Sequence, residues 1–169
     1  MIITGFMATG KTEVGRRLAR RLGRPFVDLD VLVEAAAGRS VKDIFAADGE
    51  AAFRALERAA VARACDVAGA VIATGGGTLL DPENRRRLAA AGPIICLSAS
   101  PEEILRRVGD ASSRPLLANG NGPEDRLTRI RGLLGQRAQA YAVATHQVDT
   151  SGLTPDEVVA RVQAVVGGR

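Results

Sequence analysis

Short apolar runs alternate along the chain with longer stretches in which apolar residues recur at helical spacing. The apolar runs predict strands at 1–4, 26–28, 70–74, 93–97 and 146–149. The intervening stretches predict helices at 11–22, 29–37, 40–46, 49–68, 81–91, 101–108, 123–144 and 154–166. Strands that are almost wholly apolar and separated by helices are typical of a parallel sheet with helices on both faces. The pattern therefore predicts an α/β fold in three layers.

One polar segment, "GDASSRPLLANGNGP" at 109–123, interrupts this alternation. A structureless stretch of this length inside a compact domain is often a lid over a binding site, although a plain surface loop is the alternative. Arg114 is followed directly by Pro-Leu-Leu, which favours a segment that docks. We expect a lid at about 109–124.

The composition limits the class of protein. A chain of 169 residues without a linker fits one domain spanning 1–169, and 46% hydrophobic with 25% charged residues is ordinary for a globular protein. Its apolar runs are shorter than the roughly 18 residues that a membrane span needs, and "MIITG" is no signal peptide. Two cysteines and one histidine give no pattern of a disulfide framework or zinc site. We expect a cytoplasmic monomer.

The formal net charge of +4 raises the question of an anionic partner. With no Trp, one Tyr and four Phe, the chain has few side chains on which nucleic-acid bases could stack. Small anions are therefore the expected partners, rather than nucleic acid or a membrane. Lys11 and Lys42 are the only lysines, so a lysine in a motif is more informative here than an arginine.

The clearest motif is "GFMATGKT" at 5–12, which matches G-x-x-x-x-G-K-[ST] between a predicted strand and a predicted helix. The backbone N–H groups of such a P-loop and the start of its helix bind phosphate. Lys11 would reach the β- and γ-phosphates, and Thr12 would bind Mg²⁺. We expect ATP and Mg²⁺ as cofactors, with nucleotide contacts from Ala8, Thr9, Gly10, Lys11, Thr12 and Glu13.

Two acidic residues lie at the end of the second predicted strand, in "FVDLD". Asp28 and Asp30 lie two positions apart, so they share one side if the chain stays extended. One could hold the metal through water, and the other could orient or deprotonate an acceptor hydroxyl. Capping of the next helix is the alternative for either residue.

The predicted helix at 49–68 carries a candidate anion site. Arg54 and Glu57 are three residues apart, and Glu50 precedes Arg54 by one turn. They could form an ordinary solvated ion-pair face, or they could hold the guanidinium ready for a carboxylate. Farther along, "VIATGGG" ends a predicted strand with Gly75, Gly76 and Gly77, more glycines than a turn requires.

Together these segments resemble the shikimate kinase family. The matching segments occur in the family's order over about residues 2 to 149: "GFMATGKTEVGRRLARRLG", "FVDLD", "SVKDIFAADGEAAFRALE", "VIATGGG", "RPLL" and "RAQAY". The resemblance implies a five-stranded parallel sheet of the nucleoside-monophosphate-kinase type. It also implies transfer of the ATP γ-phosphoryl group to the 3-hydroxyl of shikimate, in aromatic amino-acid biosynthesis.

On the nucleotide side, the resemblance makes Lys11 and Thr12 the phosphate and Mg²⁺ ligands, with Asp28 reaching the metal through water. Arg114 would come from the lid to the transferring phosphate, where positive charge stabilises the transition state. Arg107 matches a nucleotide-side arginine, although the adjacent Arg106 leaves the register open.

On the acceptor side, within about residues 29–60 and beyond, the resemblance makes Asp30 the residue that binds the shikimate hydroxyls and accepts the proton. Arg54 and Arg137 would clamp the substrate carboxylate, and Glu57 would brace Arg54. The backbone of Gly75–Gly77 would leave room for the acceptor ring.

Some positions depart from the family pattern. Glu13 replaces a small hydroxyl residue, Leu29 stands where Ser or Thr is frequent, and "TSGLTP" at 150–155 lacks an arginine that some members place near adenine. Two other readings stay open. The first is a P-loop kinase for another polyol acid such as gluconate, or for a nucleoside monophosphate. The second is a non-catalytic ligand-sensing module, which would be expected to have lost a catalytic residue or to carry a helix-turn-helix.

Overall fold

The computed structural model describes residues 1–109 and 122–167. Arg114 and most of the expected lid lie outside the described residues. None of the described helices is long and apolar enough to cross a membrane.

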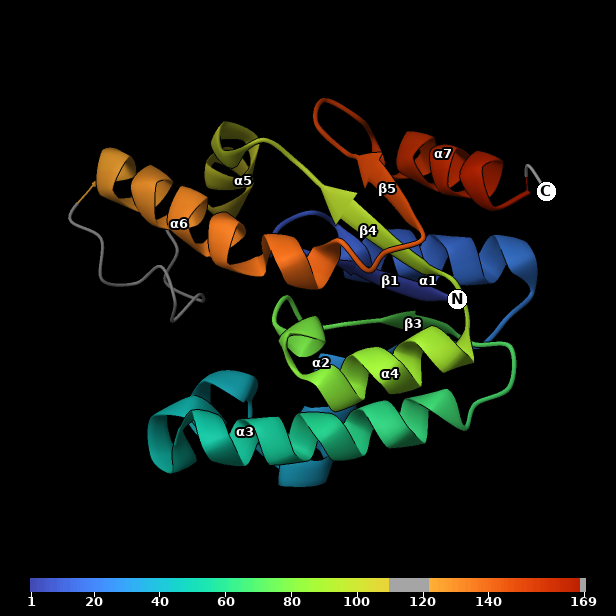
Figure 1. Cartoon of the computed structure of the whole chain (residues 1–169), viewed down its shortest axis with the longest axis horizontal. Coiled ribbons are helices and arrows are strands. Elements are labelled where there is room, and N and C mark those ends of the chain that lie inside the picture. Colours follow the sequence, from blue (N-terminus) through green and yellow to red (C-terminus); the bar gives the residue numbers. More distant parts are fainter. Residues whose placement is uncertain (110–121, 168–169) are drawn as a thin grey trace.

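The centre of the molecule is a five-stranded sheet in which all strands are parallel (Figure 1). Its strands are β1 (Ile2–Gly5), β2 (Phe26–Asp28), β3 (Val71–Ala73), β4 (Ile94–Ser98) and β5 (His146–Asp149). They lie in the order β2-β3-β1-β4-β5. This arrangement confirms the predicted parallel sheet and the predicted positions of the strands.

Helices cover both faces of this sheet (Figure 1). They are α1 (Lys11–Leu22), α2 (Leu29–Ala37), α3 (Val41–Cys65), α4 (Pro82–Ala91), α5 (Pro101–Val108), α6 (Pro123–Tyr141) and α7 (Pro155–Gly167), with a short 3₁₀ helix, η1 (Thr78–Leu80). The three-layer α/β/α sandwich predicted from the sequence is confirmed.

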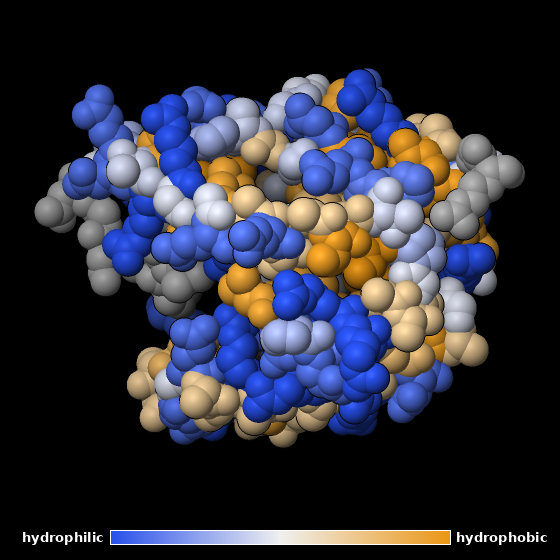
Figure 2. Space-filling view, in the orientation of Figure 1, coloured by the Kyte–Doolittle hydropathy of each residue, from blue (hydrophilic) through white to orange (hydrophobic). Residues whose placement is uncertain are grey.

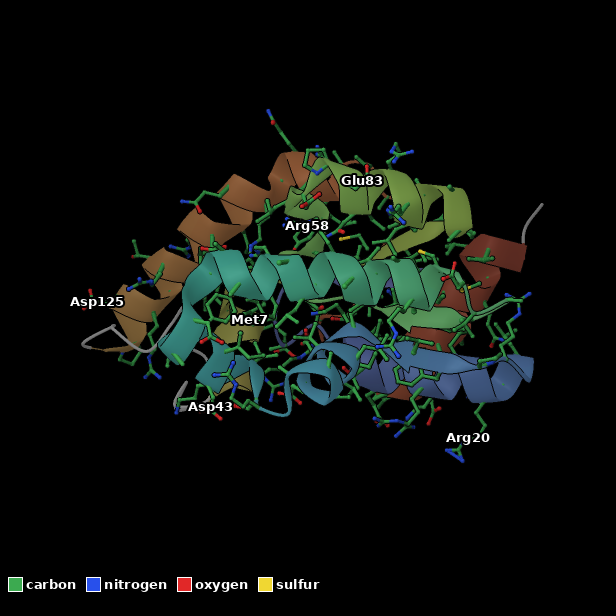
Figure 3. The ribbon with its side chains drawn as sticks, turned by 90° about the horizontal axis from the view of Figure 1, so that it is seen from below. Met7, Arg20, Asp43, Arg58, Glu83 and Asp125 are labelled. Carbon is green, nitrogen blue, oxygen red and sulfur yellow. The ribbon has the colours of Figure 1, made fainter. Side chains whose placement is uncertain are left out.

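The core has two layers, one on each face of the sheet, because successive side chains of a strand point to opposite faces. Ile2 and Ile94 pack with α2, α3 and α4, whereas their neighbours Ile3 and Ile95 pack with α1 and α7. A short apolar strand therefore supplies both layers. A smaller cluster joins Phe6 of the P-loop to α5 and α6. Figure 3 shows Met7 inside the molecule and Arg20 at its periphery.

The long element α3 consists of two helices that meet at a kink, as the predicted helices at 40–46 and 49–68 imply. Gly49 separates them with dihedral angles that are not helical (φ 79°, ψ 178°). Glycine adopts this positive φ without a Cβ clash, so the chain changes direction there and resumes as a helix. The second of these helices ends at Cys65, three residues earlier than predicted.

Candidate active site

The P-loop, residues 5–12, folds tightly between β1 and α1. Gly10 begins the helix in the left-handed region (φ 89°), and Ala8 also has a positive φ of 61°. The Thr9 hydroxyl and the Lys11 ammonium both donate to the carbonyl of Phe6, at 2.8 Å. The loop therefore curls around this carbonyl at the amino end of α1, the arrangement that suits a bound phosphate.

The first acidic residue, Asp28, joins the P-loop to the next helix. One oxygen of its carboxylate accepts from the Thr12 hydroxyl at 2.8 Å, and the other accepts from the backbone N–H of Asp30 at 3.0 Å. Asp28 therefore caps α2, as the alternative interpretation predicted, while it also meets the predicted metal ligand Thr12.

The Thr12 hydroxyl and the Asp28 carboxylate could both serve as oxygen ligands of Mg²⁺. This ion binds few protein ligands and completes its coordination shell with water and phosphate oxygens. Within residues 1–109 and 122–167, no group of three or more His, Cys, Asp or Glu side chains could hold a metal ion on its own. A metal at Thr12 and Asp28 would therefore depend on the nucleotide.

Asp30 lies in the first turn of α2 beside this pair. Its side chain still reaches solvent, but burial by the surrounding atoms and the negative charge of Asp28 raise its pKa, whereas Lys11 lowers it. A carboxylate with a raised pKa is a stronger base than an ordinary aspartate. The environment of Asp30 therefore suits a group that accepts a proton.

The glycine turn, residues 75–77, is the meeting point of the acceptor-side residues. A Cβ built on Gly75 would lie 3.2 Å from a carboxylate oxygen of Asp30, and one on Gly76 would lie 3.1 Å from Arg137. On Gly77 it would lie only 2.8 Å from Arg54. The sequence suggested that the bare backbone makes room for the acceptor. The structure adds that the turn also makes room for the side chains around it.

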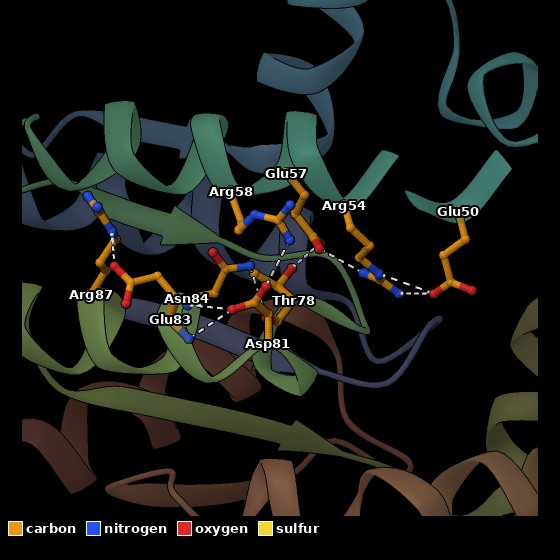
Figure 4. Close-up of polar contacts among 9 residues, drawn as sticks. All are labelled: Glu50, Arg54, Glu57, Arg58, Thr78, Asp81, Glu83, Asn84 and Arg87. Atoms are coloured by element: carbon orange, nitrogen blue, oxygen red, sulfur yellow. Dashed lines mark hydrogen bonds and ion pairs between the residues drawn. The ribbon is translucent and has the colours of Figure 1, made fainter. Parts of the chain in front are cut away.

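Arg54 is held from two sides on α3 (Figure 4). Its guanidinium donates to Glu57 at 2.7 Å and to Glu50 at 3.0 Å, and it lies 5.3 Å from the ring centre of Phe53. Burial alone would lower the pKa of Arg54, but hydrogen bonds and charges from Glu57 and Glu50 raise it. Glu57 is only 1% exposed. The alternative of a wholly solvated ion-pair face is therefore wrong.

Arg137 reaches the turn from α6, on the opposite side. It is buried at 5% exposure, with its guanidinium carbon 4.9 Å from the ring centre of Phe6. One helical turn later, the Tyr141 hydroxyl donates to the carbonyl of Gly76 at 2.6 Å. Burial raises the pKa of Tyr141 to about 12, so this donor stays protonated at neutral pH. The sequence analysis missed Tyr141, although its i+4 spacing from Arg137 places both on one helix face.

Arg107 and Arg106 face different surroundings. Arg107 donates to the carbonyls of Ala8 and Thr150, at 3.3 and 2.7 Å, whereas the Arg106 side chain is 72% exposed. Arg107 is thus the residue that links α5 to the P-loop. The Glu13 carboxylate accepts from Arg17 of the same helix, at 2.6 Å.

The surface is notched between α3 and α6, at the left of Figure 2. The two helices that carry Arg54 and Arg137 border this notch. Within the described ranges, the structure brings Asp30, Arg54 and Arg137 together at the glycine turn beside the P-loop. The Glu13 side chain pairs with Arg17 instead, and Arg114 lies outside these ranges.

Comparisons with known proteins agree with this geometry. The family model for shikimate kinase matches residues 7–166. A shikimate kinase of Geobacter metallireducens is 43% identical over 169 residues, which cover 100% of this chain and 92% of the relative. One of Symbiobacterium thermophilum is 48% identical over 165 residues, which cover 96% and 92%.

Solved structures give the same result. The shikimate kinase of Acinetobacter baumannii in complex with shikimate superposes with a TM-score of 0.91 at 31% identity, covering 99% of this chain and 92% of that one. A gluconokinase of Sinorhizobium meliloti covers 99% of this chain and 90% of that one, but with a TM-score of 0.59 and 18% identity it shows the shared fold alone. The matches over nearly the full length, in sequence and in structure, place the chain in the shikimate kinase family.

Proposed function

We propose that this protein transfers the γ-phosphoryl group of ATP to the 3-hydroxyl of shikimate. The observation that carries the proposal is the glycine turn, which gathers a carboxylate and two arginines beside a P-loop. A small acid with several hydroxyls needs both: cations for its carboxylate and a base for the reacting hydroxyl. The reaction belongs to aromatic amino-acid biosynthesis.

On the nucleotide side, backbone N–H groups of residues 8–13 and the Lys11 ammonium would hold the phosphates. Thr12, with Asp28 through water, would hold Mg²⁺, which offsets the negative charge of the phosphates when bound. Arg107 would fix the P-loop against the loop at Thr150, through the contacts described above. Arg114 would add positive charge at the transferring group.

On the acceptor side, Arg54 and Arg137 would bind the carboxylate of shikimate. Because they approach the turn from α3 and α6, the ring would lie over Gly75–Gly77 with its hydroxyls toward Asp30. Asp30 would orient the 3-hydroxyl and accept its proton as the oxygen attacks the γ-phosphorus. This attack breaks the bond between the γ-phosphorus and the oxygen that bridges it to the β-phosphorus. The bridging oxygen leaves as part of ADP.

A coupled assay of ADP release tests the proposal. Shikimate is expected to give Mg²⁺-dependent turnover well above the rate with ATP alone. Gluconate and a nucleoside monophosphate, offered at equal concentration, serve as alternative acceptors. The assignment would fail if one of them were turned over while shikimate gave no rate above background.

A further inference from the structure

A buried hydrogen bond connects the end of the glycine turn to the carboxylate that holds Arg54. Thr78, the first residue of η1, is fully buried, and its hydroxyl donates to Oε1 of Glu57 at 2.7 Å. Oε2 of the same carboxylate accepts from Arg54 at 2.7 Å (Figure 4). Each oxygen of Glu57 therefore has one partner, and the two partners lie in different elements.

This arrangement leaves Glu57 little freedom to turn. A buried carboxylate that loses a hydrogen-bond donor is left with a desolvated oxygen, which is unfavourable. Gly75 packs directly against the bond, because a Cβ there would lie 3.1 Å from the Thr78 hydroxyl and 3.2 Å from Oε1 of Glu57. The hydroxyl of Thr78 thus sets which way the carboxylate faces.

Thr78 is in turn fixed by helix α4. The side-chain amide of Asn84 donates to the carbonyl of Thr78 at 3.3 Å. Asp81 caps this helix by accepting from the backbone of Glu83 and Asn84, and it also pairs with Arg58 of α3 at 3.2 Å. The position of the Thr78 hydroxyl is therefore determined by the packing of α4 on α3 (Figure 4).

We propose that Thr78 is a positioning residue for the acceptor: its hydroxyl holds Glu57 in the orientation that directs the Arg54 guanidinium toward the substrate carboxylate. The identity of that acceptor rests on the proposed function. Thr78 acts through Glu57 and Arg54 and takes no part in the chemical step. Its loss should therefore affect binding of the acceptor more than kcat or binding of ATP.

The test compares Thr78→Val, which keeps the shape but removes the hydroxyl, with Thr78→Ser, which restores it. For Thr78→Val we expect a rise of about tenfold in KM for shikimate, in the range for a weakened hydrogen bond to a charged group, and less than a twofold change in KM for ATP. Thr78→Ser should return KM for shikimate to within about twofold of wild type. Thr145→Val is a matched control, because it removes a threonine hydroxyl at the opposite end of the sheet.

Three outcomes would overturn the proposal: an unchanged KM for shikimate in Thr78→Val, equal rises for shikimate and ATP, or failure of Thr78→Ser to restore the value. If Thr78→Val does not fold, Thr78→Ala removes the same hydroxyl and enters the comparison in its place. In a double-mutant cycle with Arg54→Ala, loss of the hydroxyl should have no further effect on KM for shikimate.

Crystal structures of wild type and variant without substrate give a readout that is independent of turnover. Arg54 is expected to leave its position on Glu57 in Thr78→Val and to keep it in Thr78→Ser. An unmoved Arg54 in Thr78→Val contradicts the positioning role even if the wild-type enzyme is active. Conversely, a wild-type protein inactive on shikimate overturns the proposed function, and the crystal structures alone then decide the role of Thr78.

Discussion

At the scale of single residues, Asp30 is a carboxylate with a raised pKa at a position where the proposed reaction needs it ionised. Burial and the charge of Asp28 raise the pKa of Asp30 in the folded protein. Ionisation of this group therefore costs folding free energy at pH values above its folded-state pKa, and the cost disappears below the pKa of the unfolded chain. Function and stability make opposite demands on this residue.

Replacement of Asp30 by asparagine should separate its effect on turnover from its effect on stability. Turnover of Asp30→Asn is expected to fall at least about 10²-fold, with ATP affinity near normal, because the proton acceptor is lost. At pH 7 the variant should be more stable than wild type in chemical unfolding, and this gain should shrink as the pH falls toward about 4. Asp125→Asn, at the periphery in Figure 3, is the control and should show no such gain. A variant no more stable than wild type at pH 7 would contradict this account.

The third glycine of the turn makes a separate prediction. A Cβ on Gly77 would lie 2.8 Å from the end of the Arg54 side chain, and its φ of −110° is open to alanine. Gly77→Ala should therefore displace the guanidinium rather than the backbone. KM for shikimate is expected to rise about tenfold, while the free energy of unfolding changes by less than about 1 kcal/mol.

Gly132→Ala is the matched control for this substitution. Gly132 lies on α6 with no atom within 4 Å of its added Cβ. The control should stabilise the protein by about 0.5–1 kcal/mol and leave both KM values unchanged, because alanine favours a helix more than glycine does. If Gly77→Ala left KM for shikimate at the wild-type value, Arg54 would not be the group that the turn accommodates.

At the scale of elements, α6 and α3 approach the glycine turn from opposite sides. The Tyr141 hydroxyl of α6 donates to the carbonyl of Gly76, and Thr78, the residue after the turn, donates to Glu57 of α3. Burial raises the pKa of Tyr141 to about 12, so its hydrogen bond should persist from acid to mildly alkaline pH.

Tyr141→Phe removes this bond while it keeps the ring. We expect the free energy of unfolding to fall by about 1–2 kcal/mol, since a buried carbonyl loses its donor, and by the same amount at pH 7 and pH 9. Urea denaturation of wild type and variant at both pH values measures this. No loss at either pH would show that the hydrogen bond does not stabilise the turn.

The elements themselves could largely be predicted from the sequence. Apolar runs such as 93–97 and the P-loop motif depend on local patterns, and the strands and α1 lie where these patterns place them. The break inside α3 at Gly49 also falls between the two helices predicted there, because glycine adopts a positive φ that ends one helix before the next begins.

At the scale of the whole molecule, the strand order brings the site together. Neighbouring strands β2, β3 and β1 end at the same edge of the parallel sheet. Asp28 is the last residue of β2, the glycine turn lies just after β3, and the P-loop begins at the end of β1. Ligands of open α/β sheets bind at this carboxyl edge. The fold therefore places the P-loop and the candidate acceptor-binding residues side by side.

The sequence motifs indicated candidate residues for this site but few of the contacts between them. Arg54 was a candidate from its spacing to Glu57, whereas Arg137 was predicted only through the family resemblance, because nothing local indicates that α3 and α6 meet at one turn. Thr78 and Tyr141 were missed for the same reason. Their partners, Glu57 and Gly76, are distant in the sequence, so only the packed structure reveals these hydrogen bonds.

Identification of the reaction product by phosphorus NMR tests directly whether this protein phosphorylates the 3-hydroxyl of shikimate. With Mg²⁺, ATP and shikimate, the wild-type protein is expected to form one phosphorylated product, with the phosphoryl group on the 3-oxygen and ADP in equal amount. Formation of inorganic phosphate with unmodified shikimate, or of a product phosphorylated at another hydroxyl, would contradict the account.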